Sequence, residues 1–285
     1  MIFKKLIKYI LFNFSAIFKF FFINTREEFH SNKFVLSHNL GGGTLFYEKQ
    51  QNYDDYIIVR KLGMGKDLIF ELSFNNKKKY VLKSNLIKKL NLSYEIIISS
   101  LVTYKPLFFW LSYFKSLKTE KKVKIIYLVH DYHCVCKNNN FLLNDNFFCN
   151  LSCRNCKLNE ENIITLYQKK WGNFLCLCDK VKCFSRSSQS ILEEIYRDKM
   201  LKFEILPHNT EYCDEIKPLE FNYDFLNIAI VGNCNNIAKG KLFAKSFAEY
   251  CKKIKQNLFF LGKVNKFNQI KSKNIFYLGK YNIKD

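Results

Sequence analysis

Short apolar runs alternate along the chain with longer stretches in which apolar residues recur every three or four positions. The short runs are rich in Ile, Val and Phe and predict buried strands at 34–37, 94–98, 123–129, 180–184 and 203–206. The periodic stretches predict helices at 84–90, 106–117, 160–178 and 188–198. Strands that alternate with helices in this way are typical of an α/β domain with a largely parallel sheet.

Two local signals refine this pattern. Residues 56–83 contain three β-rich runs, and the turn-forming pair Asn75-Asn76 between the last two predicts a hairpin. Ser187 or Ser188 is expected to cap the helix that follows, because a serine side chain can accept a hydrogen bond from a free N–H group of the first turn.

The α/β pattern restarts near the C-terminus, with strands expected at 226–231, 257–262 and 274–279 and a helix at 239–254. This stretch is shorter than a complete doubly wound domain. We therefore divide the chain into five segments. They are an N-terminal basic aromatic helix (1–32), a Rossmann-like domain (33–210), a cysteine-containing insertion within it (134–158), a linker (211–224) and an incomplete second domain (225–285).

The first 23 residues are dense in Phe, Ile and Leu and contain four lysines but no acid. The uncharged run between Lys8 and Lys19 is too short to span a bilayer. A basic, aromatic helix of this kind is suited to the headgroup region of an anionic membrane. We expect a peripheral protein at the inner face of the cytoplasmic membrane; the alternative is a helix packed on the body of the protein.

The whole chain carries a net charge of +21, which favours an anionic partner: nucleic acid, anionic lipid or a phosphorylated small molecule. No nucleic-acid recognition motif accompanies the charge, so no specific nucleic acid is expected. A non-catalytic basic binding protein remains an alternative function. The eleven cysteines are an odd number, and no convincing cleavable signal precedes them, which favours reduced thiols in the cytoplasm.

The strongest candidate chemistry follows the strand 123–129. That strand leads directly into His130-Asp131-Tyr132-His133, and ligands of open α/β sheets bind at the carboxyl ends of the strands. His130 and Asp131 are our candidate catalytic pair, with a buried, structurally satisfied histidine as the alternative. A glycine loop, Gly41-Gly42-Gly43, follows the strand 34–37, where its backbone N–H groups can approach a phosphate; a simple tight turn is the alternative.

Cysteines cluster after His130 in a spacing that suits two kinds of metal site. Cys136, Cys149, Cys153 and Cys156 form a four-thiolate set compatible with a structural zinc. The last three also resemble the triad of radical SAM enzymes, which holds an iron–sulfur cluster. One observation argues against the iron–sulfur interpretation: Asn155 stands where radical SAM enzymes usually have an aromatic residue. Buried cysteines without a metal are the third reading.

Taken in order, several segments resemble the two-domain GT-B glycosyltransferases of the large retaining group, in particular a polysaccharide-synthesis subgroup. These segments are His38-Asn39-Leu40-Gly41-Gly42-Gly43, His130-Asp131-Tyr132, Cys136, Phe148-Cys149, Cys153-Arg154-Asn155-Cys156, Cys183-Phe184-Ser185, Leu206-Pro207-His208-Asn209, Val231-Gly232 and Lys239-Gly240. The resemblance covers about residues 33 to 285. It implies an α/β, GT-B-like fold with one complete Rossmann-like domain and the start of a second.

The resemblance also implies a function: transfer of a sugar from a nucleotide-diphosphate donor to a glycan or lipid-linked acceptor of a cell-surface polysaccharide or lipopolysaccharide. It assigns the donor phosphates to Gly42, Gly43, Lys239 and Gly240, and the reacting region to His130 with Asp131 in support. It requires no cofactor. Two departures stand out: Asn233 occupies the position where many relatives have an arginine, and the acidic pair of the donor domain does not appear before Asp285. The resemblance therefore implies a C-terminally truncated donor domain, and an inactive or split fragment is the alternative to an active enzyme.

Overall fold

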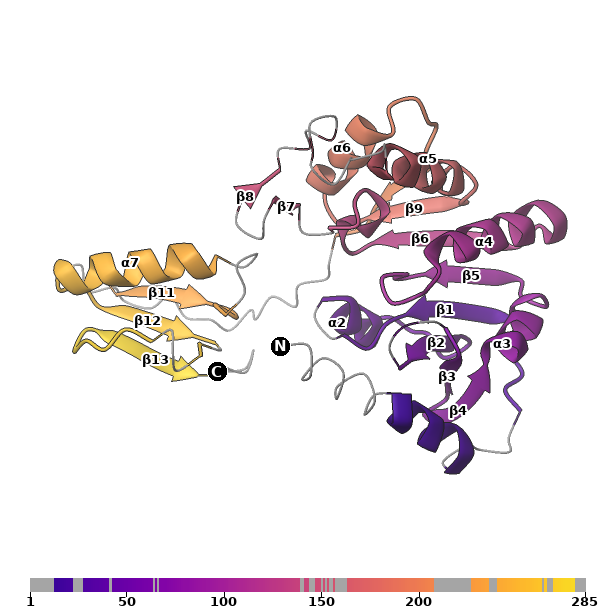
Figure 1. Ribbon diagram of the computed structural model, residues 1–285, viewed down its shortest axis with the longest axis horizontal. Coiled ribbons are helices and arrows are strands. Elements are labelled where there is room, and N and C mark those ends of the chain that lie inside the picture. Colours follow the sequence, from indigo (N-terminus) through magenta and orange to yellow (C-terminus); the bar gives the residue numbers. More distant parts are fainter. Residues whose placement is uncertain are drawn as a thin grey trace. The chain divides into compact units, whose positions relative to one another are not determined.

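The protein divides into two compact units (Figure 1). Unit 1 comprises Met1–Asn139 and Ser152–Asn209, and unit 2 comprises Asn140–Leu151 and Thr210–Asp285. A computed structural model describes residues 13–22, 28–40, 43–63, 65, 67–138, 141–143, 147–149, 151, 153, 156, 163–207, 227–235, 240–262, 264–265 and 269–279.

Unit 1 is built on a sheet of eight strands in the order β10-β9-β6-β5-β1-β2-β3-β4. Six of them run parallel: β1 (Lys33–Ser37), β2 (Ile57–Leu62), β5 (Glu95–Ile98), β6 (Lys124–Val129), β9 (Lys180–Cys183) and β10 (Phe203–Ile205). At one edge, β3 (Ile69–Phe74) pairs antiparallel with β2 and with β4 (Lys77–Leu82). The expected α/β architecture with a largely parallel sheet is confirmed, and the antiparallel pairing of β2 with β3 is new.

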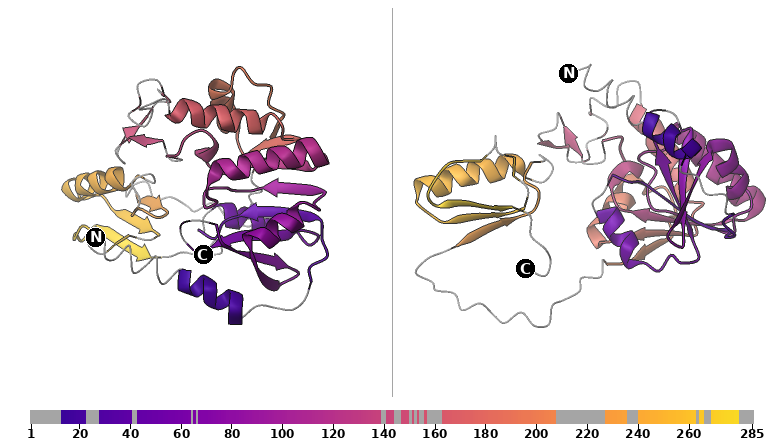
Figure 2. Two further views of the ribbon diagram at one scale, coloured as in Figure 1. Left: turned by 45° about the vertical axis from the view of Figure 1, so that its right-hand side comes forward. Right: turned by 90° about the horizontal axis from the view of Figure 1, so that it is seen from below.

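Helices cover both faces of this sheet (Figure 2), which explains why the central strands β5 and β6 are apolar along most of their length. The helices of unit 1 include α2 (Gly43–Gln50), α3 (Lys83–Leu90), α4 (Leu107–Lys121), α5 (Ile163–Leu175) and α6 (Arg186–Ile195). On one face the rings of Phe114 (α4), Phe174 (α5) and Tyr127 (β6) pack together. On the other face Tyr47 of α2 packs against a cluster that includes Leu128.

The hairpin predicted at Asn75-Asn76 is present between β3 and β4. Both residues have left-handed backbone, with φ of 46° and 61°. A two-residue turn of this kind matches the right-handed twist of the strands, and asparagine tolerates the left-handed region better than most residues. The expected serine cap is wrong by two or three positions. Ser185 caps α6 and accepts a hydrogen bond from the N–H of Ser188 at 3.1 Å, because the helix already begins at Arg186.

A helix at residues 13–22 precedes the sheet and packs on its antiparallel edge. Ala16 of this helix is buried in a cluster with Ile69 and Tyr80. Phe14, Ile17, Phe18, Phe21 and Phe22 of this helix are exposed, so the helix is apolar on more than one face. Among the described residues, no helix is both long and apolar enough to cross a membrane.

Unit 2 contains three parallel strands, β11 (Ile228–Val231), β12 (Leu258–Leu261) and β13 (Ile275–Gly279), in that order across the sheet. Helix α7 (Lys241–Lys253) connects the first two and buries Ala244, Ala248 and Cys251 against them. A short antiparallel pair, β7 (Leu142–Leu143) and β8 (Phe147–Phe148), belongs to the same unit. The strand and helix order predicted after the linker is therefore observed.

Candidate functional site

The carboxyl edge of the parallel strands in unit 1 gathers the residues that follow each strand. His38 follows β1, Ser99 follows β5, His130 follows β6 and Phe184 follows β9. Because neighbouring parallel strands end at the same edge, these residues come together although they are far apart in the sequence.

Aromatic rings from two elements hold the imidazole of His130. It stacks on Phe184, with ring centroids 4.6 Å apart and planes inclined by 21°. Tyr47 of α2 meets it edge-on at 5.2 Å. His130 itself is half-buried. The ring is therefore fixed in orientation at the end of β6. Its Nε2 atom is buried, while the residue as a whole keeps part of its surface accessible.

Asp131 shapes the turn that follows. Its Oδ1 accepts a hydrogen bond from the N–H of His133 at 2.9 Å and so caps η1 (Tyr132–Cys134). Its charge also acts on two histidines. Burial lowers the pKa of both His38 and His133, and the Asp131 carboxylate partly opposes this effect. Both pKa values remain below the usual value, so both imidazoles are neutral near pH 7.

A buried carboxylate, Glu48, joins α2 to the strand ends. It accepts hydrogen bonds from Arg60 at 2.7 Å, from Ser99 at 3.2 Å and from Ser37. A buried charge is tolerated when it is paired and hydrogen-bonded in this way. The network fixes α2 and with it Tyr47, the partner of His130. The sequence pattern did not identify Glu48 or Arg60, because no local motif connects them.

The predicted donor-binding residues are described only in part. Gly43 is the first residue of α2, and a Cβ placed on it would meet no atom within 4 Å. Space is therefore open beside its backbone. In unit 2, Gly240 precedes α7 with a φ of 80°, a conformation that favours glycine. Gly42 and Lys239 lie outside the described residues.

None of the four predicted metal ligands is part of a disulfide bond in this structure. Cys136, Cys149, Cys153 and Cys156 are all half-buried, and Cys153 Sγ accepts a hydrogen bond from Gln168 at 3.4 Å. Within the described ranges, no three His, Cys, Asp or Glu side chains come together in a way that could hold a metal ion. The zinc site stays a prediction.

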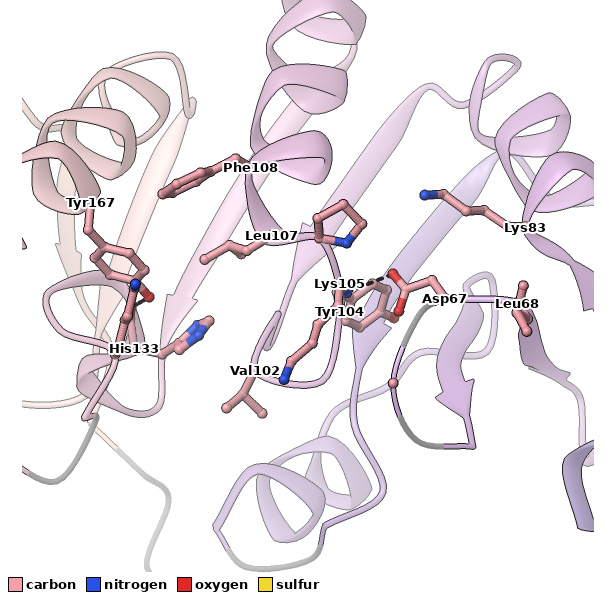
Figure 3. Close-up of a pocket in the computed structure, with 13 residues that line it drawn as sticks. Asp67, Leu68, Lys83, Val102, Tyr104, Lys105, Leu107, Phe108, His133 and Tyr167 are labelled. Atoms are coloured by element: carbon pink, nitrogen blue, oxygen red, sulfur yellow. Dashed lines mark hydrogen bonds between the residues drawn. The ribbon is translucent and has the colours of Figure 1, made fainter. Parts of the chain in front are cut away.

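A cavity of about 830 Å³ lies within unit 1 (Figure 3). It borders the loop between β5 and α4, and His133 and Tyr167 form part of its wall. The sequence pattern placed His133 in the cluster after β6. It did not identify the lysines that surround this cavity, because they come from three separate segments.

No protein family and no curated protein matches the chain by sequence. Its function therefore has to be argued from the geometry.

Proposed function

We propose that the protein is a glycosyltransferase that moves a sugar from a nucleotide-diphosphate donor to a cell-surface polysaccharide or lipopolysaccharide acceptor. The observation that carries the proposal is the position of His130. It lies at the carboxyl edge of a largely parallel sheet, held between Phe184 and Tyr47, with part of its surface accessible. In open α/β sheets this edge is where ligands bind.

In the proposed mechanism the diphosphate of the donor is the leaving group, and negative charge builds up on it as the bond to the sugar breaks. Backbone N–H groups and a cation that are already in place stabilise that charge without reorganisation. In unit 1 the proposal assigns this task to Gly42 and Gly43. Within unit 2 it assigns donor binding to Lys239 and Gly240. The open space beside Gly43 supports it, because a diphosphate needs close approach to the backbone.

His130 is assigned to the reacting end of the sugar or to the acceptor hydroxyl, where an imidazole nitrogen can donate or accept a hydrogen bond. Asp131 is assigned a supporting role. Its hydrogen bond to the N–H of His133 fixes the turn that begins directly after His130, so it holds the backbone at this position.

The helix at residues 13–22 supports a membrane location for this activity. Phe14, Phe21 and Phe22 are 67%, 70% and 75% exposed, and Lys19 lies among them in the sequence. We propose that this helix lies in the headgroup region of an anionic membrane, where its apolar side chains leave water and lysines meet lipid phosphates. Such a position would bring the enzyme to a lipid-linked acceptor.

The decisive experiment offers the full chain labelled UDP-, GDP- and dTDP-sugars and measures bound donor and released sugar. We expect one nucleotide class to bind and to be hydrolysed slowly when no acceptor is present. Failure of all three classes to bind would contradict the proposed function.

A further inference from the structure

The cavity of about 830 Å³ in unit 1 has a wall of unusual composition. Three lysines contribute to it, Lys83 at the start of α3, Lys105 in the loop before α4 and Lys137 after η1. Figure 3 draws Lys83 and Lys105 together with the other residues that line the cavity. The volume lies in the range of small-molecule binding sites, about 300–1,000 Å³.

Among the described residues, nearby acids do not balance the positive charge of this wall. The one acid among its described lining residues is Asp67, whose side chain is fully buried. Asp67 already pairs with Lys61 at 3.1 Å and accepts hydrogen bonds from the Trp110 indole and from the N–H of Lys105. In the described part of the chain, no carboxylate lies within ion-pair distance of the Lys105 or Lys137 ammonium group. The cavity is therefore suited to a ligand with more than one negative charge.

The remainder of the wall is largely apolar. Leu68, Val102, Leu107 and Phe108 line it, together with the ring of Tyr167. These side chains present no hydrogen-bonding groups apart from the tyrosine hydroxyl, which donates to the backbone oxygen of His133. The sugar and base of a nucleotide would find few polar partners here, whereas a hydrocarbon chain would be removed from water.

His133 is a further residue of the cavity wall. Its imidazole packs edge-on against Trp171, with ring centroids 5.8 Å apart. Its Nδ1 is fully buried, so the ring contributes packing to the wall and the contacts with an anion are left to the lysines.

We propose that this cavity binds a phosphate or diphosphate ester of an apolar alcohol. Lys105 and Lys137 contact the anion, and the hydrocarbon lies along Leu107 and Phe108. A single carboxylate would neutralise only one of the lysines, whereas a diphosphate can neutralise several. The inference deepens the proposed function and rests on it for its biological meaning: such an ester is the lipid-linked form of a sugar acceptor.

The two tryptophans of the chain both lie next to the cavity and provide a direct readout. Trp110 donates to Asp67 and Trp171 packs on His133. We expect farnesyl diphosphate to change the tryptophan fluorescence and to bind at least about tenfold more tightly than pyrophosphate or farnesol, because only it offers both charge and hydrocarbon. Pyrophosphate binding as tightly as farnesyl diphosphate would overturn the proposal.

Two variants and a matched control test the contacts. Lys105→Gln and Lys137→Gln change exposed side chains and are expected to weaken farnesyl diphosphate binding about tenfold each. Lys115→Gln removes the same charge from an exposed position on α4 outside the cavity wall and should leave the dissociation constant unchanged. Equal affinity of wild type, Lys105→Gln and Lys137→Gln would mean that the overall charge of the chain, not this cavity, attracts the anion.

The donor assay separates this inference from the proposed function. Binding of farnesyl diphosphate by a chain that binds no nucleotide sugar would contradict the proposed function and leave the cavity assignment intact. Donor hydrolysis by a chain that does not bind farnesyl diphosphate would contradict the cavity assignment alone.

Discussion

Buried carboxylates of unit 1 are paired with side chains from neighbouring segments. Glu48 is paired with Arg60, and Asp67 with Lys61. Glu95 accepts hydrogen bonds from Lys124 and Tyr56. Because desolvation of a charge is costly, a buried ion that loses its partner destabilises the fold much more than the same loss at the surface.

Replacing Lys61 with methionine should therefore lower the free energy of unfolding of unit 1 by about 3–5 kcal/mol, because Asp67 would stay buried without its cation. Urea unfolding monitored by tryptophan fluorescence measures this unit, since Trp110 and Trp171 both belong to it. The control is Lys33→Met. Lys33 pairs with Asp55 at 3.5 Å, and the Asp55 side chain is 81% exposed, so this carboxylate stays in water without its partner and the loss should cost less than about 1 kcal/mol. Equal losses would contradict the assignment of Lys61–Asp67 as the stabilising pair.

His130→Asn is expected to reduce sugar transfer by about 100-fold or more while donor binding changes little, because an imidazole that acts at the reacting centre typically contributes a factor of this size. Steady-state transfer rates and donor dissociation constants measure the two effects separately. His30→Asn changes an exposed histidine of the same unit and serves as the control. Transfer at the wild-type rate by His130→Asn would show that His130 is a structural histidine.

At the scale of elements, the β3–β4 hairpin depends on two residues in the left-handed region. Asn76→Ala should lower the free energy of unfolding by about 1 kcal/mol, because a Cβ without a compensating polar group is unfavourable there. Asn76→Gly removes the Cβ and should change stability by less than about half of that. The midpoint of urea unfolding distinguishes the two variants; an Ala variant as stable as the Gly variant would mean that the turn relaxes to another form.

The helix at residues 13–22 should carry the membrane contact. Phe18 and Phe22 stack at 4.9 Å on its exposed surface, and both side chains leave water if the helix enters the headgroup region. The double variant Phe18→Ser, Phe22→Ser should weaken binding to phosphatidylglycerol vesicles by about 100-fold, since burial of one phenylalanine contributes about 1.5–3 kcal/mol.

Co-sedimentation with the vesicles measures this binding. Leu92→Ser is the control, because Leu92 is an exposed apolar residue outside the helix. If the double variant sediments as wild type does, the exposed face of the helix is not the membrane contact.

For the whole molecule, the neutral histidines predict a loss of stability in mild acid. Burial lowers the pKa of His38 and His133 in the folded state, and Asp131 only partly offsets it. In the unfolded chain both have a pKa of about 6.5. As the pH falls below that value the unfolded chain gains protons that the folded chain does not, so stability decreases.

Two carboxylates predict a further loss of stability at lower pH. Burial by itself would raise the pKa of Glu95 and of Asp179. Hydrogen bonds from Lys124 and Tyr56 bring the pKa of Glu95 below its usual value. Hydrogen bonds from Lys118 and from the N–H of Ile125 do the same for Asp179. Their contribution to the stability of the fold is complete above their pKa in the unfolded chain, and it is lost as the pH falls through their pKa in the folded chain.

Urea midpoints measured at about pH 7.5, 6 and 5 should therefore decrease in that order. The variant His38→Asn, His133→Asn should flatten this decrease, while the loss of stability below about pH 4.5 remains. A wild-type midpoint that is constant between pH 7.5 and 5 would contradict the burial of these histidines.

The sequence alone determined most of the elements and their type. Apolar runs and helical periodicity are local properties, so they identified the parallel strands, the helices between them and the turn at Asn75-Asn76. The position of His130 at a strand end followed from the same pattern. The cap of α6 was misplaced because a run of serines offers several equivalent donors and acceptors, and only the exact start of the helix selects Ser185.

Only the tertiary structure decided which of these segments meet. The order of the strands places β1 between β2 and β5, and this brings Glu48 to Arg60 and Ser99. Three separate segments bring Lys83, Lys105 and Lys137 to the wall of one cavity. The partners of a side chain often lie tens of residues away in the sequence. Which partners it meets depends on the order of the strands and on the path of the loops. No local periodicity encodes either of these, because each is set by the packing of the whole unit.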